Sequence, residues 1–213
     1  MIKRPATRRE EMLLFARNFF RHPRMLGSVI PSSRFLIREL LERIDWNRAD
    51  VVVEYGPGIG CITTEILRRM PAGSTLVAIE TNREFVRYLR TTVCDERLHV
   101  VEGSAADVGA ILRKLGHERA NYIISGIPFS TLPAAMREHI LRESREVLAP
   151  DGTFLVYQFS SRVLKDLERI FGRVERGFEP LNLLPAHLFF CATVSTALQM
   201  AALGDGTKVA SPP

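Results

Sequence analysis

Short apolar runs alternate with helix-like segments from Asp50 onward. The runs cover residues 51–56, 75–80, 98–103, 121–126 and 153–159, and the segments at 61–70, 82–93, 105–115 and 133–148 between them are helix-like. Short apolar runs separated by helices are typical of a parallel sheet with helices on both faces. The stretch "LAPDGTF" predicts a Pro-Asp-Gly turn that leads into the fifth strand.

The pattern ends with a helix at about 161–171, a strand near 173–179 and a last apolar strand at 186–195. Two strands without a further helical domain predict a hairpin that closes one edge of the sheet. We therefore expect an α/β fold with a mostly parallel seven-stranded sheet, an antiparallel last strand and helices on both faces. Residues 204–213 have no apolar pattern, and we expect a disordered tail there.

Residues 1–45 precede the first strand and are expected to form an amphipathic leader with capping helices. On a helical projection of residues 8–21, arginines 17 and 21 lie together on the flank of an apolar face. Leu13 and Phe20 lie beside this face, which is formed by Met12, Phe15, Ala16 and Phe19. Such a basic helix suits a lipid headgroup layer. The alternative is an ordinary helix docked on the sheet. Pro23 ends or bends this helix, and a Ser cap is expected to begin the next one, "RFLIRELLERI".

Composition and charge say more about possible binding partners than about the fold. A chain of 213 residues suits one domain, which we expect to span residues 46–203. The net charge of +5 favours an anionic partner: nucleic acid, anionic lipid or a phosphorylated ligand. Cys61, Cys94 and Cys191 form no CxxC pair, so neither a metal site nor a disulfide framework is predicted. Without an apolar run of about 18 residues or a secretory signal, we expect a cytoplasmic protein that can still touch a membrane.

The stretch "VVVEYGPGIGCITTEIL" places Gly56, Gly58 and Gly60 directly between a strand and a helix. Their missing side chains let a ligand approach the backbone. A dinucleotide fingerprint would need its third glycine where Cys61 stands, whereas GxGxG with a preceding acid is the S-adenosylmethionine pattern. Glu80 ends the second strand, where a carboxylate can accept both hydroxyl protons of a ribose. The alternative is a tight turn and a solvated acid.

The order "EYGPGIG", "VAIETN", "VEGSAADV", "SGIPF" and "LAPDGTFLVYQF" resembles class I S-adenosylmethionine-dependent methyltransferases, with their Rossmann-like fold, over nearly the whole chain. Within that class, "RHPRMLGSVIPSS", "VVEYGPGIG", "SGIPF" and "NLLPAHLF" resemble the bacterial phospholipid N-methyltransferases, which are similar in turn to rRNA adenine dimethyltransferases. In this family the leader covers the active site as lid and membrane anchor. The resemblance implies that lipid phosphate pairs with Arg17, Arg21, His22 and Arg24.

The resemblance also implies S-adenosylmethionine as the cofactor. Its methionine part would lie along Glu54, Gly56, Gly58 and Gly60. Glu80 would hold the ribose, and Thr81 and Asn82 would flank the adenine. The remaining cofactor contacts are expected at Gly103, Ser104, Ala105 and Ser125. Ser104 stands where this motif often has Asp, so adenine N6 is expected to bind Ser104, the backbone or Asp107.

"SGIPFS" ends the fourth strand, at the carboxyl edge of the sheet where this fold places its chemistry. Adenine amino-group methyltransferases carry Asn or Asp, then Pro, then an aromatic residue here, whereas Ser125 and Gly126 supply no amide. We expect the Ser125 hydroxyl and the carbonyls of Gly126 or Ile127 to accept hydrogen bonds from a primary amine. Phe129 is expected to face the methylammonium through a cation–π contact. The alternative is a turn that packs on the core.

An alkylammonium titrates near the Lys value of about 10.4, so the substrate amine must lose a proton before it attacks. Tyr157, His139 and His187 are candidate bases, and Tyr157 is favoured because it lies late in the fifth strand. We expect an enzyme that methylates phosphatidylethanolamine successively toward phosphatidylcholine, at the inner face of the cytoplasmic membrane. Neither a nucleic-acid partner nor an obligate protein partner is expected.

Two alternatives remain at this point. The first is an rRNA adenine N6-dimethyltransferase, which the positive charge suits because phosphate contacts dominate RNA binding. Ser125 and the expected lack of a C-terminal helical RNA-binding domain speak against it. The second is a non-catalytic module that binds the cofactor or a membrane.

Overall fold

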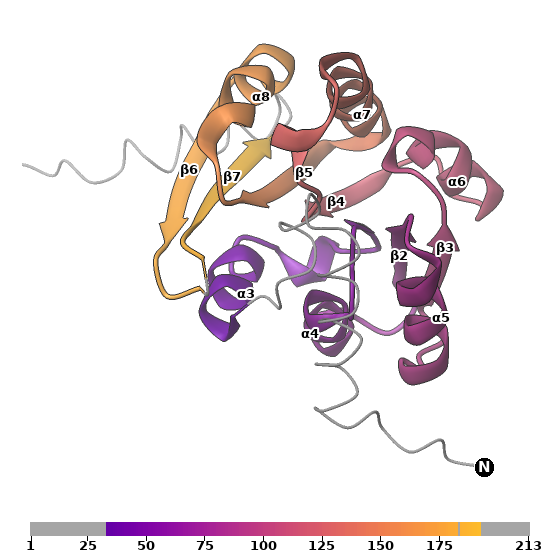
Figure 1. Cartoon of the computed structure of the whole chain (residues 1–213). Helices are drawn as coiled ribbons and strands as arrows, with labels where there is room; N and C mark the ends of the chain where they lie inside the picture. The colour runs from indigo at the N-terminus through magenta and orange to yellow at the C-terminus, as the bar shows by residue number, and fades with distance from the viewer. Residues whose placement is uncertain (1–32, 183, 193–213) are drawn as a thin grey trace, which may run out of the picture.

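The computed structural model of the chain describes residues 33–182 and 184–192. Within this part, seven strands form one sheet in the order β3-β2-β1-β4-β5-β7-β6 (Figure 1). The strands are β1 (Val51–Tyr55), β2 (Thr75–Glu80), β3 (Leu98–Glu102), β4 (Ala120–Ser125), β5 (Leu148–Gln158), β6 (Val174–Glu179) and β7 (Ala186–Ala192). The first five pair in parallel, whereas β7 runs antiparallel to β5 and β6. The predicted sheet is confirmed.

Helices cover both faces of the sheet (Figure 1). One face carries α3 (Arg34–Leu41), α4 (Cys61–Arg69) and α5 (Arg83–Thr92), and the other carries α6 (Val108–Lys114), α7 (Ala134–Val147) and α8 (Leu164–Phe171). Short 3-10 turns η2 (Trp46–Arg48), η3 (Ala105–Asp107), η4 (Phe129–Thr131) and η5 (Ser161–Val163) lie in the connections. No helix in the described ranges is both long and apolar enough to cross a bilayer.

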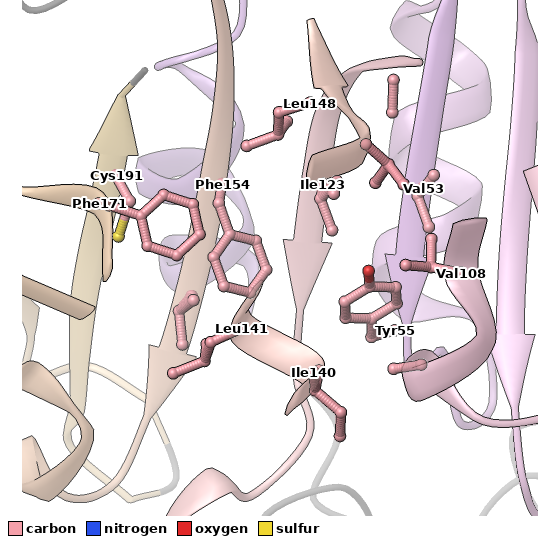
Figure 2. Packing of buried hydrophobic residues seen from close by; sticks show 14 of the residues in the cluster. Val53, Tyr55, Val108, Ile123, Ile140, Leu141, Leu148, Phe154, Phe171 and Cys191 are labelled. Carbon is pink, nitrogen blue, oxygen red and sulfur yellow. The ribbon is translucent and has the colours of Figure 1, made fainter. Parts of the chain in front are cut away.

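Alternating strand side chains divide the buried apolar residues into two clusters, one on each face of the sheet. Val53, Tyr55 and Phe154 point toward α6, α7 and α8, as Figure 2 shows for this cluster. The Phe154 ring meets Tyr55 edge-on at 6.2 Å and stacks on Phe171 at 5.4 Å. Val52, between Val53 and Val51 in β1, faces the opposite cluster beneath α3 and α4.

Helix α3 begins where the sequence predicted a serine cap. Ser33 has an extended backbone, and its hydroxyl accepts a hydrogen bond from the Leu36 N–H at 3.2 Å. The cap satisfies one of the helix's free N–H donors. Leu36, Leu40 and Leu41 are fully buried in the cluster beneath α4, so α3 packs onto the same sheet as the strands that follow it.

The expected Pro-Asp-Gly turn before the fifth strand is wrong. β5 already begins at Leu148 and contains Pro150 and Gly152, with a register irregularity against β4 where Ala120 pairs with Leu148 and Tyr122 with Thr153. A Cβ on Gly152 would lie 2.9 Å from the carbonyl oxygen of Asn121. Close approach of the two backbones, rather than a turn, therefore explains the glycine.

The sheet order reverses between β1 and β4, and such a switch point is where open α/β sheets bind ligands, outside the carboxyl ends of the strands. The register aligns Tyr55 at the end of β1 with Ser125 at the end of β4, and Ser125 with Val156 of β5. The glycine loop and the "SGIPF" loop therefore leave the sheet side by side.

Candidate active site

The glycine loop has the backbone that its sequence requires. Gly56, Gly58 and Gly60 have φ values of 68°, 58° and 85°, in the left-handed region that favours glycine. A Cβ on Gly56 would lie 3.0 Å from Ile127 Cγ2, and one on Gly60 would lie 2.7 Å from Leu89 Cδ2. The loop is thus held between the "SGIPF" loop and α5, and Gly60 opens helix α4 without a capping side chain.

Glu54 lies beneath this loop with only 3% of its surface exposed. Thr63, on the first turns of α4, donates a 2.7 Å hydrogen bond to Glu54 Oε2. Burial raises the pKa of Glu54 to about 7, partly opposed by the Thr63 hydrogen bond and reinforced by the charge of Glu80. A cation beside the loop would favour the ionised form of this carboxyl group.

Glu80 is the second buried acid of the site, with 5% of its surface exposed. Its Oε2 accepts the Gly58 N–H at 3.2 Å, and its Oε1 accepts the Asn82 N–H at 2.8 Å. Burial raises the pKa of Glu80, and the hydrogen bonds from Asn82 and Gly58 oppose that rise. In the described part of the chain, neither Glu54 nor Glu80 forms an ion pair with Lys or Arg.

The other predicted cofactor residues line the same edge of the sheet. Thr81 is exposed directly after Glu80, and the Gly103 N–H donates to the Glu80 carbonyl at 3.0 Å, which joins the ends of β2 and β3. Ser104 accepts the Ala106 N–H at 3.1 Å and so caps η3. Ala105 is 7% exposed, whereas Asp107 is exposed.

Ile127 contributes packing rather than a free carbonyl. Its carbonyl oxygen accepts the Gln158 side-chain N–H at 2.7 Å and the Phe129 N–H at 2.9 Å. Because a carbonyl has two lone pairs, this oxygen is not available as the predicted acceptor for a substrate amine. Sequence reasoning missed Gln158, whose buried amide holds the "SGIPF" loop against the end of β5; a polar residue in an apolar strand was the only signal.

Gly126 packs directly against Tyr157. A Cβ built on Gly126 would lie 2.2 Å from the Tyr157 hydroxyl oxygen and 2.7 Å from Cζ of its ring. The phenol therefore occupies the place of a side chain at position 126. This brings together two residues predicted to take part in catalysis, one from the end of β4 and one from β5.

Ser125 and Phe129 differ in what they offer to a ligand. Ser125 is fully buried, and its Oγ has no hydrogen-bond partner among the residues that the structure describes. Phe129 is also fully buried, and its ring meets Phe154 edge-on at 6.3 Å inside the core. The predicted cation–π contact of Phe129 is therefore not supported, and the alternative of a turn that packs on the core holds for this ring.

The two candidate histidine bases lie differently. His139 is exposed on α7. His187 is half-buried on β7, paired in register with Gln158, and its ring stacks on Phe189 at 6.2 Å. Six predicted membrane-contact residues lie outside the described residues: Arg17, Phe19, Phe20, Arg21, His22 and Arg24.

Comparison with known proteins decides the family. Residues 27–179 match the methyltransferase small domain. The chain is 36% identical over 193 residues to the ornithine lipid N-methyltransferase of Singulisphaera acidiphila, which covers 87% of this chain and 97% of that protein. The chain belongs to this methyltransferase family.

More distant similarities agree with the assignment. This methyltransferase is 34% identical over 98 residues to ribosomal RNA small subunit methyltransferase A of Laribacter hongkongensis, a match that covers 45% of this chain and 35% of that protein. A Geobacter sulfurreducens methyltransferase structure shares its fold with TM-score 0.59 and 15% identity over 89% of this chain and 93% of that one. The structure of the Burkholderia thailandensis 1,6-didemethyltoxoflavin-N1-methyltransferase, solved with S-adenosylhomocysteine, matches with TM-score 0.58 and 14% identity. This match covers 91% of this chain and 93% of that one.

The site fits S-adenosylmethionine, the cofactor of this methyltransferase. The glycine loop follows a tight left-handed backbone that leaves no room for side chains at Gly56 and Gly60, and two buried carboxyl groups without an ion-pair partner in the described part suit a cationic ligand. The Ser125 Oγ, at the end of the neighbouring strand β4, has no hydrogen-bond partner in the described part of the chain. Bound cofactor supplies an electrophilic methyl group on a sulfonium centre. Glu80 would hold the ribose of the bound cofactor, and positioning of cofactor and substrate would be the main contribution of the chain's own residues to rate.

Proposed function

We propose that this methyltransferase transfers methyl groups to the primary amine of a membrane lipid headgroup. The observation that carries the proposal is the packing of Tyr157 against Gly126. A methyltransferase that acts on a planar adenine amine places an amide side chain at this position to hold the ring plane. Here position 126 is a glycine, and the Tyr157 hydroxyl packs against it. A single hydroxyl group suits a flexible alkyl amine.

The Tyr157 hydroxyl is assigned to the amine itself. Its oxygen accepts one N–H of the substrate and directs the nitrogen lone pair toward the cofactor methyl group. Tyrosine and an alkylammonium have similar reference pKa values, about 10 and about 10.4, so the phenolate form of Tyr157 can take the proton of the substrate ammonium before the free amine attacks and the bond between the methyl group and sulfur breaks.

Two headgroups carry such an amine. Phosphatidylethanolamine, methylated successively to phosphatidylcholine, is the substrate that the sequence predicted. Ornithine lipid is the substrate in the name of the relative that matches along nearly its whole length. Both present a primary alkylamine on a flexible chain, and the proposal covers both until a headgroup assay ranks them.

The proposal places the enzyme at the inner face of the cytoplasmic membrane. A lipid amine lies at the bilayer surface, so the carboxyl edge of the sheet must come close to that surface during turnover. The basic amphipathic leader at residues 8–21 would supply attraction to anionic lipid, and the net charge of +5 supports that attraction.

A Tyr157→Phe variant tests the assigned role. We expect kcat on lipid vesicles to fall about 100-fold, the lower end of the range for losing a positioned proton-transfer group, while the Kd for S-adenosylmethionine stays within about twofold. Tyr122→Phe is the matched control, because Tyr122 lies on β4 and its hydroxyl accepts the Asp45 N–H at 3.1 Å, away from the glycine loop. Unchanged kcat in Tyr157→Phe, or an equal loss in both variants, would contradict the role.

A further inference from the structure

Large apolar side chains that are exposed concentrate at one hairpin. Across the described ranges, the exposed large hydrophobic residues are Met136, Phe178, Leu181 and Leu184, with 44%, 56%, 63% and 42% of their surfaces exposed. The last three lie within seven positions of one another, at the end of β6 and in the connection to β7. Single exposed apolar residues need no explanation, but a cluster indicates a contact surface.

The cluster lies at the carboxyl edge of the sheet, where the active site is. Glu179 at the end of β6 pairs with Ala186 at the start of β7, and His187 pairs with Gln158 at the end of β5. A continuous set of contacts leads from the site to the cluster: Gln158 holds the Ile127 carbonyl, and the His187 ring lies 5.2 Å from the ring of Phe178.

Hydrogen bonds hold this connection in place while the side chains of Leu181 and Leu184 stay exposed. Asn182 is 8% exposed, and its Oδ1 accepts the Ser33 N–H at 2.8 Å, which joins the hairpin to the start of α3 (Figure 1). Its Nδ2 donates to the Leu184 carbonyl at 3.0 Å, and the Leu181 N–H donates to Glu179 Oε1 at 2.6 Å. An ordered loop loses less conformational entropy when it binds.

We infer that the β6–β7 connection, through Phe178, Leu181 and Leu184, inserts into the interfacial region of a lipid bilayer. This inference rests on the proposed function, because a lipid amine reaches the carboxyl edge only if that edge faces the membrane. Arg34, exposed and next to Ser33, and Arg176, exposed on β6, lie near the loop and supply positive charge at headgroup level. The loop would be a second membrane contact, in addition to the one predicted for residues 8–21.

Fluorescence of a relocated tryptophan tests the insertion directly. The chain has one tryptophan, Trp46, so Trp46→Phe/Leu181→Trp reports from the loop alone. With vesicles of phosphatidylethanolamine and phosphatidylglycerol, we expect a blue-shifted emission that acyl-brominated lipids quench. Ala72→Trp in the same background is the control, because Ala72 is exposed before β2, at the opposite edge of the sheet. Its emission is expected to stay unchanged.

Three results would overturn the inference: no binding to vesicles, solvent-like emission of the tryptophan at 181 on vesicle-bound protein, or a blue shift without lipid that grows with protein concentration. The last result would assign the loop to contact with a second copy. Leu181→Ser should also weaken vesicle partitioning about fivefold, with S-adenosylmethionine binding unchanged as the folding control. Insertion without methyl transfer to lipid would contradict the proposed function alone, and methyl transfer without insertion would contradict the loop alone.

Discussion

The Tyr157 hydroxyl lies where residue 126 would place its side chain, 2.2 Å from a Cβ built on Gly126. Gly126 does not adopt a positive φ, unlike Gly56, Gly58 and Gly60, so its backbone does not require glycine. The glycine is needed for space. The relationship makes the two positions depend on each other, and this dependence can be measured.

Gly126→Ala is expected to destabilise the protein by about 1–3 kcal/mol, because the added methyl group overlaps the Tyr157 ring. In a Tyr157→Ala background, the same substitution should cost less than about 0.5 kcal/mol. Urea unfolding of the two single variants and the double variant gives the coupling energy. Equal costs in both backgrounds would show that the two residues do not share this space.

Glu80→Gln is expected to weaken S-adenosylmethionine binding by roughly 10- to 100-fold, because a charged acceptor for the ribose hydroxyls is lost. Isothermal titration calorimetry measures the affinity. Glu102→Gln is the matched control. Glu102 pairs in register with Glu80 on the next strand, but its carboxylate accepts a hydrogen bond from the Arg83 side chain and none from the glycine loop in the described part of the chain. A similar loss of affinity in both variants would assign the effect to surface charge.

The buried Glu54 predicts a stability that depends on pH. Burial raises the folded-state pKa of Glu54 to about 7, above its ordinary value of 4.5, so the folded protein binds the proton more tightly than the unfolded chain does. Stability without cofactor is therefore full below pH 4.5 and falls as pH rises to about 7, by about 3 kcal/mol for this group. Glu54→Gln should remove most of that fall in urea unfolding series at several pH values. A fall of unchanged size would exclude Glu54 as its origin.

The same carboxyl group should couple cofactor binding to proton release. S-adenosylmethionine is cationic and favours the ionised form, so below pH 7 the affinity is expected to fall by up to about tenfold per pH unit. Calorimetry in two buffers with different ionisation enthalpies counts the released protons. Proton release of the same size in Glu54→Gln would assign it to another group, and Glu80 would be tested next because burial also raises its pKa.

Phe19→Ser/Phe20→Ser is expected to reduce sedimentation with anionic vesicles if the leader lies in the headgroup layer, because the apolar face loses two aromatic rings. Cofactor affinity should not change. Leader residues lie outside the described part of the structure, so the measurement tests the sequence prediction directly. Unchanged sedimentation would favour a helix docked on the protein.

Much of the fold could be predicted because it depends on local pattern. The seven strands were placed within a few residues, since apolar runs bounded by Gly, Pro and polar residues are strong signals. The prediction for the connection before the fifth strand failed for a non-local reason: Pro150 and Gly152 are typical of a turn, but both lie within β5, where the backbone at Gly152 packs closely against Asn121 of β4.

The site was predictable in its backbone and less so in its side chains. Residue spacing predicts the glycine loop and the two acids Glu54 and Glu80. In the structure, Glu80 bonds to the loop at Gly58, and Glu54 bonds to Thr63 of the helix that follows the loop. Two residues of β5, distant in sequence, change what the "SGIPF" loop offers. Gln158 donates a hydrogen bond to the Ile127 carbonyl, and Phe154 packs against the buried Phe129 ring. Spacing alone does not show which polar atom is already bonded.

Transfer of labelled methyl from S-adenosylmethionine tests the central claim most directly. The wild-type chain would be incubated with vesicles containing phosphatidylethanolamine, with vesicles containing ornithine lipid and with structured ribosomal RNA, and the lipids resolved by headgroup. We predict label in mono-, di- or trimethylated lipid and none in RNA, with the more strongly labelled lipid being the preferred headgroup. Label in RNA alone would contradict the assignment to lipid amines and leave only the cofactor site standing.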